Sequence, residues 1–357
     1  MFSVLVTLSE RFSLDDFVRA ETHFLDAVLL PVHERNWRDV LSALNAADEN
    51  GWALRFLLWA KGKRVKNVPL HRFAQHPKLL GWVVEQLDDP ALLAMLRATT
   101  ETGLTVAWQQ PSPFTHGVLS VHPQRNGKWW AWLTVNEPEQ IFPTAINALM
   151  DGAETLCFAQ LPDEEPAGER ERLKALASLG VQMRLWQPLL ANRGESWEVI
   201  VEGARCRCWQ LATGAWIALV VPTGTATTFA VPLPFRALPS WRAYGLRFPA
   251  LVRFPMQVKG ETTQVKVSGV TMAELIWVTG DRERLEQMHR RAGELLPKAM
   301  QFAVQWVLAR KERIGEVPSE VNAQIWRMLQ AAKRRQFSKG YLLARQLLPA
   351  LPPPASS

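Results

Sequence analysis

Residues 26–60 read DAVLLPVHERNWRDVLSALNAADENGWALRFLLWA. The two ends, 26–32 and 53–60, are short apolar runs that predict buried strands. Residues 37–50 between them have the spacing of an amphipathic helix, and Gly51 follows in the position where helices favour glycine. A strand, a helix and a second strand in this order predict one unit of a parallel sheet.

The same alternation continues on both sides of this unit. Eight strands are expected, at residues 2–9, 26–32, 53–60, 79–85, 104–109, 117–122, 129–136 and 154–161. Eight such units predict a (β/α)8 barrel over residues 1–192, with a doubly wound open sheet as the structural alternative. Roughly 180 residues is short for a fold that usually takes about 250, so the helices and loops are expected to be trimmed. One helix is expected to begin at Pro143.

The pattern changes after Gly194. Turn-separated alternating strands fill residues 197–279 and predict an antiparallel β-sandwich over 195–279. A helical domain is expected over 281–348, with Pro297 and Pro318 each opening a helix. The chain closes with a proline-rich segment, 349–357, that is expected to be a disordered tail.

The composition is that of a globular protein, with 48% hydrophobic and 21% charged residues. No apolar run approaches the roughly 20 residues that a membrane-spanning helix needs, and the first ten residues lack the features of a signal peptide. We therefore expect a cytoplasmic protein that makes no membrane contact. Cys206 and Cys208 fall on one face of a strand, which favours packing over metal chemistry. No metal site or cofactor is expected.

Basic residues gather in the helical domain. Residues 281–348 hold 14 Lys and Arg against seven Asp and Glu, a net charge of +7 that equals the net charge of the whole chain. Clusters such as Lys333-Arg334-Arg335 suit phosphate contacts. However, acidic residues interleave with them, and Leu295, Met300, Ala303, Trp306 and Val307 supply an apolar face. A helical bundle that packs on the barrel or on a second copy of the chain is therefore expected rather than a nucleic-acid surface.

The active site of a (β/α)8 barrel lies where the strands end. Those ends carry carboxylates, amides and several of the 16 tryptophans, which are the residue types of carbohydrate chemistry. No phosphate loop, G-x-S-x-G elbow or H-E-x-x-H motif is present. Glu85 and Glu137, after the fourth and seventh strands, form the candidate catalytic pair, although acids are also favoured at helix starts such as the one after Glu137. The candidate sugar-binding residues are His33, Trp59, Trp108, Gln109, His122, Asn136 and Gln160.

Residues 76–82, HPKLLGW, resemble the HPALLGW signature of the fourth strand in glycoside-hydrolase-like (β/α)8 barrels. Residues 137–141 and 148–153 are similar to the seventh helix and eighth strand of these proteins, and the resemblance extends to about residue 280. It implies a glycoside hydrolase whose acid/base is a glutamate. Those enzymes carry Asp-Glu-Pro after the signature, whereas this chain has Asp88-Asp89-Pro90 with Glu85 upstream.

The expected function is therefore action on, or binding of, an oligosaccharide at the barrel. Hydrolysis would retain the anomeric configuration if Glu85 and Glu137 lie roughly 5 Å apart. The alternative is a catalytically inactive barrel that serves carbohydrate binding or protein assembly. A third hypothesis is that the basic helices dock onto a polyanion.

Overall fold

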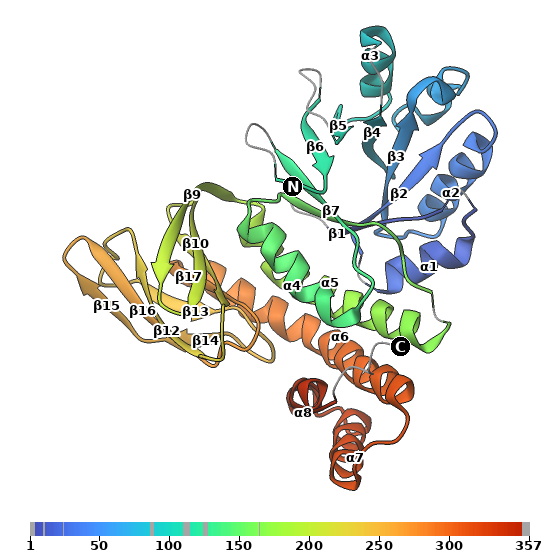
Figure 1. Ribbon diagram of the computed structural model, residues 1–357. Coiled ribbons are helices and arrows are strands. Elements are labelled where there is room, and N and C mark those ends of the chain that lie inside the picture. The colour runs from blue at the N-terminus through green and yellow to red at the C-terminus, as the bar shows by residue number, and fades with distance from the viewer. Residues whose placement is uncertain are drawn as a thin grey trace. The chain divides into compact units, whose positions relative to one another are not determined.

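A computed structural model describes residues 4–9, 11–23, 25–85, 89–109, 115–123, 128–163 and 165–351 (Figure 1). The chain divides into two compact units. The first comprises Met1–Asn136 and Asn147–Asp163, and the second comprises Glu137–Ile146 and Glu164–Ser357. The domain boundaries expected near residues 192 and 280 stay a proposal. No helix among the described residues is long and apolar enough to cross a membrane.

The first unit is a closed barrel of eight parallel strands in chain order. The strands are β1 (Val4–Thr7), β2 (Ala27–Val32), β3 (Arg55–Lys61), β4 (Leu79–Glu85), β5 (Thr105–Trp108), β6 (Gly117–Ser120), β7 (Trp129–Leu133) and β8 (Thr155–Phe158). Pairing of β1 with β8 closes the ring, so the barrel is confirmed over the open sheet. The eight expected strands are all present, each within a few residues of its predicted ends.

Among the described residues, four helices connect strands of this barrel along the chain. They are α1 (Leu14–Thr22), α2 (Trp37–Glu49), α3 (Pro90–Ala98) and α4 (Pro138–Met150). Between β3 and β4 stand only two short 3-10 turns, η1 (Gly62–Val65) and η2 (Leu70–Phe73). The prediction that α4 begins at Pro143 is wrong, because Pro138 takes the first helical position, where a missing N–H costs no hydrogen bond.

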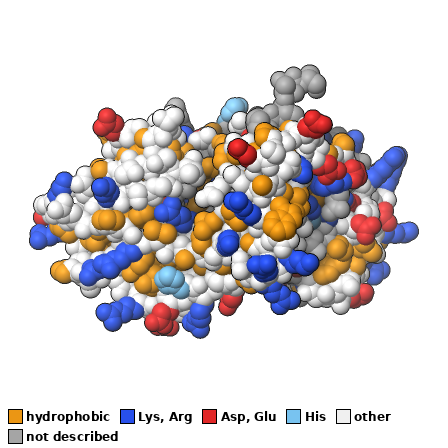
Figure 2. Space-filling view, turned by 90° about the horizontal axis from the view of Figure 1, so that it is seen from below, with side chains coloured by type: hydrophobic (Ala, Val, Ile, Leu, Met, Phe, Trp, Pro, Cys, Tyr) orange, Lys and Arg blue, Asp and Glu red, His pale blue; other side chains and the backbone are white. Residues whose placement is uncertain are grey.

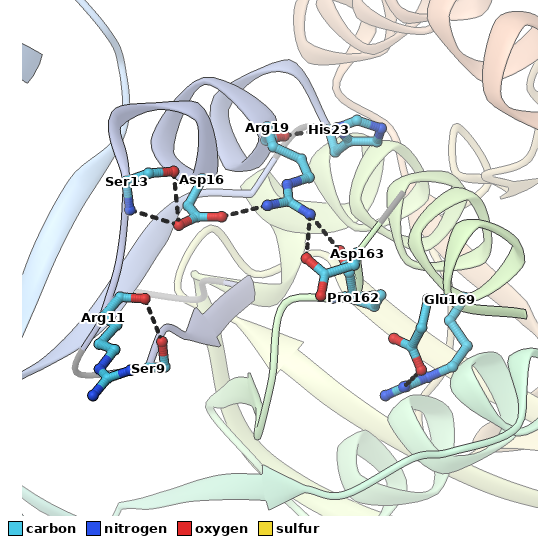
Figure 3. Close-up of polar contacts among 10 residues, drawn as sticks. Ser9, Arg11, Ser13, Asp16, Arg19, His23, Pro162, Asp163 and Glu169 are labelled. Carbon is cyan, nitrogen blue, oxygen red and sulfur yellow. Dashed lines mark hydrogen bonds and ion pairs between the residues drawn. The ribbon is translucent and has the colours of Figure 1, made fainter. Parts of the chain in front are cut away.

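Figure 3 shows how α1 is held at its two ends. Asp16 accepts hydrogen bonds from the Ser13 backbone N–H at 2.7 Å and from the Ser13 hydroxyl at 3.1 Å, so the two residues cap the start of this helix. Arg19 pairs with Asp16 and donates to Asp163 Oδ1 at 2.7 Å. Asp163 lies in the segment that follows β8, so this arginine joins the first helix of the barrel to the chain that leaves its last strand.

Gly81, in the HPKLLGW stretch, marks a close approach between β4 and the residue before β5. A Cβ at this position would lie 2.6 Å from the carbonyl oxygen of Leu104. We expect Gly81→Ala to lower the free energy of unfolding by about 1–3 kcal/mol, because backbone must move to admit the methyl group. Chemical denaturation measures this change. Gly224→Ala, whose Cβ meets nothing within 4 Å, is the control. Equal stability of the two variants would contradict the prediction.

The second unit contains two antiparallel sheets. One has six strands in the order β14-β13-β17-β11-β10-β9, and the other has three in the order β12-β16-β15. The strands are β9 (Arg193–Val201), β10 (Ala204–Leu211), β11 (Trp216–Pro222), β12 (Thr228–Leu233), β13 (Arg242–Gly245), β14 (Val252–Phe254), β15 (Met256–Lys259), β16 (Thr262–Ser268) and β17 (Glu274–Thr279). Side chains from both sheets share one core, which includes Cys206 and Cys208. Both are free thiols, and burial raises their pKa values.

Four helices complete the second unit: α5 (Ala167–Leu190), α6 (Arg282–Ile314), α7 (Ser319–Lys333) and α8 (Phe337–Ala350). Pro318 precedes α7 as expected. The prediction that Pro297 begins a helix is wrong, because α6 runs through it without a break. Of the expected disordered tail, residues 349 and 350 belong to α8 and 352–357 lie outside the described residues.

Candidate functional site

The mouth of the barrel, where the strands end, is closed by three tryptophans that we call the tryptophan triad: Trp59 of β3, Trp108 of β5 and Trp132 of β7. All three pack on the residues that fill the barrel interior. The Trp108 ring centroid lies 4.8 Å from that of Trp59 and 4.7 Å from that of Trp132. The tilted and edge-on contacts are those that aromatic rings favour. The predicted site included Trp59 and Trp108 and missed Trp132, although the alternation of β7 aims it inward.

A pocket of about 240 Å³, here called the mouth pocket, opens beside the triad. It is formed by the ends of β1, β2 and β3, and it is lined by Thr7, Leu8, Ser9, Pro31, Val32, His33, Trp59, Lys61 and Arg64. Sites for drug-sized ligands usually enclose about 300–1,000 Å³. The mouth pocket therefore suits a ligand of about one sugar ring, with the rest of a longer ligand outside it.

His33 is half-buried in the mouth pocket and is held by its own turn. Its backbone N–H donates to Asn36 Oδ1 at 2.9 Å, and its ring Nδ1 lies 3.2 Å from the Arg35 backbone N–H, which donates to it. Because Nδ1 accepts, the neutral ring carries its proton on Nε2. The imidazole is thus fixed in orientation by the turn that carries it.

Glu85 ends β4 directly beside Lys61, which ends β3. The two residues are register partners in the parallel pair, so their side chains leave the sheet together. Lys61 Nζ lies 3.4 Å from Glu85 Oε1, and the Glu85 side chain is 12% exposed. Its other oxygen, Oε2, is buried and has no hydrogen-bond partner among the described residues. A carboxyl with one oxygen left open can take or give a proton once a substrate group approaches it.

Glu137 belongs to the second unit, at the start of α4. Its side chain is 63% exposed, and Oε2 lies 3.4 Å from Arg313 Nη2 of α6. Glu139, in the first turn of the helix, pairs with Arg310 of α6 at 2.5 Å. Both acids of the EPEQI stretch therefore bind arginines of the second unit. The catalytic pair of Glu85 with Glu137 joins residues of different units and stays a prediction.

The remaining predicted residues are exposed in the structure. They are Gln109, His122, Asn136 and Gln160. Gln109 follows the Trp108 strand with a left-handed φ of 61°, and its backbone N–H donates to Leu119 O at 2.9 Å. The backbone carbonyl of His122 accepts from the Ser120 hydroxyl at 2.7 Å. None of the four lines the mouth pocket, so their role as sugar ligands stays a prediction.

Lys61 and Arg64 are pocket residues that the predicted site omitted. The prediction rests on acids, amides and aromatic rings at the strand ends and does not include cations at the same positions. Parallel register alone places Lys61 next to Glu85. Within the described ranges, no three His, Cys, Asp or Glu side chains lie close enough to hold a metal ion.

Figure 2 shows how the charged side chains are distributed over one face of the protein. Lysine and arginine side chains are scattered over it, with acidic and hydrophobic side chains between them. A polyanion track would instead gather cations in one stripe. The expectation that nucleic acid is not a partner stays a prediction.

Several solved structures are similar to this chain. One is a noncanonical maltogenic alpha-amylase from Thermotoga neapolitana, with 10% identity over 78% of this chain and 99% of that one and a TM-score of 0.46. Another is a putative alpha-N-acetylgalactosaminidase from Bacillus halodurans, with 7% identity, 78% and 97% coverage and a TM-score of 0.44. An orotidine 5'-phosphate decarboxylase from Pyrococcus horikoshii matches 49% of this chain and 97% of its own, with 10% identity and a TM-score of 0.36.

Searches with protein-family models and with curated protein sequences give no match. The (β/α)8 class therefore rests on the strand order and closure of this chain itself. Glycoside hydrolases are among the solved structures that it resembles, as are barrel enzymes of other chemistry.

Proposed function

We propose that the protein acts on or binds an oligosaccharide at the mouth of its barrel, as glycoside hydrolases do. The observation that supports this most is the placement of the Glu85 carboxyl, largely buried and with one open oxygen, beside a pocket that Trp59 lines. The aromatic ring of Trp59 suits the apolar face of a sugar, and the adjacent Glu85 carboxyl suits proton transfer to the glycosidic oxygen. In this proposal Glu85 is the acid/base and Glu137 the nucleophile of a retaining reaction.

The second candidate function is a catalytically inactive barrel that binds carbohydrate or serves protein assembly. Two observations favour it. The residues that line the mouth pocket in the described part of the chain include no carboxylate, and the tryptophan triad fills the centre of the barrel mouth. Pairing with a second copy through the helices and a cytoplasmic location stay predictions.

A panel of aryl glycosides and matching oligosaccharides separates the two candidates. Release of the aryl group by the wild-type chain supports the hydrolase. Oligosaccharide binding without any release supports the inactive barrel, and neither release nor binding would refute both.

His33→Ala tests the place of binding. We expect the affinity for any oligosaccharide that the wild type binds to fall about two- to tenfold, because a side chain that lines the mouth pocket is lost. Isothermal titration measures the affinity, and the melting temperature serves as a check on folding. His71→Ala, at an exposed position of η2, is the control. Unchanged affinity in His33→Ala would place the sugar elsewhere.

A further inference from the structure

The second unit holds a cavity of its own, with a volume of about 160 Å³. Residues of α5, α6 and α8 line it, together with the segments that flank the start of β17. Its apolar walls include Phe142, Trp186, Phe248 and Trp306. An engineered protein cavity of about 150 Å³ takes up one benzene molecule. The body of a ligand here is therefore no larger than about one aromatic ring.

A buried carboxyl group stands in the cavity wall. Glu274, the first residue of β17, is 2% exposed, and its Oε2 lies 3.5 Å from Arg247 Nη1. Its Oε1 is buried and has no hydrogen-bond partner among the described residues. Gly245 of β13 makes room for this oxygen, since a Cβ there would come within 2.6 Å of it. Burial raises the pKa of Glu274 to about 7, against the opposing effect of Arg247.

Two further polar groups of the cavity lack strong protein partners. The Ser178 hydroxyl of α5 is buried and unpaired among the described residues. Arg345 of α8 donates to the thioether sulfur of Met272 at 3.4 Å, which is a weak acceptor, and its guanidinium lies 5.9 Å from the Phe142 ring centroid. No carboxylate of the described residues lies within ion-pair distance of Arg345.

The charges of the cavity therefore do not balance. Even when Glu274 is ionised and offsets Arg247, Arg345 is left with a positive charge beside apolar walls, and protonation of Glu274 makes the cavity more positive still. Arg345 is half-buried, and a partly desolvated cation without an anion is unfavourable, so an anion from outside would be stabilised there.

We propose that this cavity binds a small organic carboxylate whose body is at most about one aromatic ring. Arg345 would hold the carboxylate by charge-assisted hydrogen bonds, and the aromatic walls would cover the body. The Ser178 hydroxyl and the protonated form of Glu274 would supply further donors. This site is independent of the sugar proposed at the barrel mouth.

Benzoate is the probe, titrated calorimetrically into the full chain at pH 6. We expect one site per chain. Arg345→Met should weaken binding at least about tenfold, because the charged donor is removed while the apolar stem is kept. Arg327→Met, at an exposed arginine of α7, is the matched control and should bind as the wild type does. Ala299→Leu fills the cavity from α6 and should abolish binding while the chain stays folded.

The charge requirement is tested with two analogues and with pH. Benzyl alcohol should bind at least about tenfold more weakly than benzoate, and benzylamine should not bind.

Benzoate affinity should fall as the pH rises through about 7, where Glu274 loses its proton. The groups lining the cavity around Glu274 are Arg247, Tyr341 and Arg345, with neutral Ser178 and Gln182 from α5 and no ionisable side chain from α6. Absent benzoate binding, equal affinity in Arg345→Met, or tighter binding of benzylamine would overturn the proposal.

Discussion

Glu171→Ala is expected to lower the free energy of unfolding by about 3–5 kcal/mol, because it removes the buried carboxylate that pairs with Arg310 and Arg313 and leaves buried Arg310 with Glu139 as its remaining described ion-pair partner. Glu171 of α5 has no exposed side-chain surface. Its Oε1 accepts from Arg310 Nε at 2.6 Å and from the Trp306 indole at 3.2 Å, and its Oε2 accepts from Arg313 at 3.1 Å. Arg310 is only 5% exposed and also donates to Leu348 O of α8.

This network is distinct from the surface ion pairs of the same helices. Arg170 pairs with Glu312, whose side chain is 54% exposed. Glu312→Gln is therefore the control, with an expected change of at most about 1 kcal/mol. Chemical denaturation measures both variants. The double variant Glu171→Leu, Arg310→Met should recover a large part of the loss, because two apolar side chains leave no charge buried. A loss below about 1 kcal/mol in Glu171→Ala would show that the network is not buried in solution.

Glu85→Gln is the second large effect, and it concerns activity. If the barrel hydrolyses an aryl glycoside, kcat/KM for that substrate should fall by about 10²–10⁴, since glutamine keeps the shape of the side chain but cannot exchange the proton. The melting temperature should change little. The ion pair that is lost joins Glu85 to a Lys61 side chain that is 56% exposed, and such pairs contribute at most about 1 kcal/mol.

Glu101→Gln provides the control for Glu85→Gln. Glu101 is an exposed acid of the same barrel, in the loop before β5, and its substitution should leave both activity and stability unchanged. If kcat/KM of Glu85→Gln stays within threefold of the wild-type value, Glu85 is not the acid/base of the reaction. Glu137→Gln should then be compared with Arg313→Met, which breaks the pair with Glu137, and also that with Glu171, but removes no carboxyl group.

The barrel could be predicted from the sequence because its signals are local. Apolar runs and helix caps such as Asp89, which accepts from two backbone N–H groups of α3, are set by neighbours in the chain. The errors at Pro143 and Pro297 have one form: the sequence predicts a helix start at each proline, whereas the helix already begins upstream, at Pro138 or Arg282, and continues through it.

The site was predictable only in part. Strand ends identify Glu85, Trp59 and Trp108, since the fold brings those ends together. The Lys61 partner follows from strand register, which no single strand reveals. The ion pair of Glu137 with Arg313 spans 176 residues and has no local signal, so an acid that resembles a catalytic one could not be told from an acid that anchors a helix.

The path of the chain has a consequence for how this protein can be divided. Residues 137–146 leave the barrel unit, join the second unit and return to the barrel before the last strand. A fragment cut after residue 192 would keep Glu137, Glu139 and Glu171 but lose Arg310 and Arg313, which pair with them. A cut at this place therefore separates the acids from their arginines, because a stretch of chain between two barrel strands belongs to the second unit.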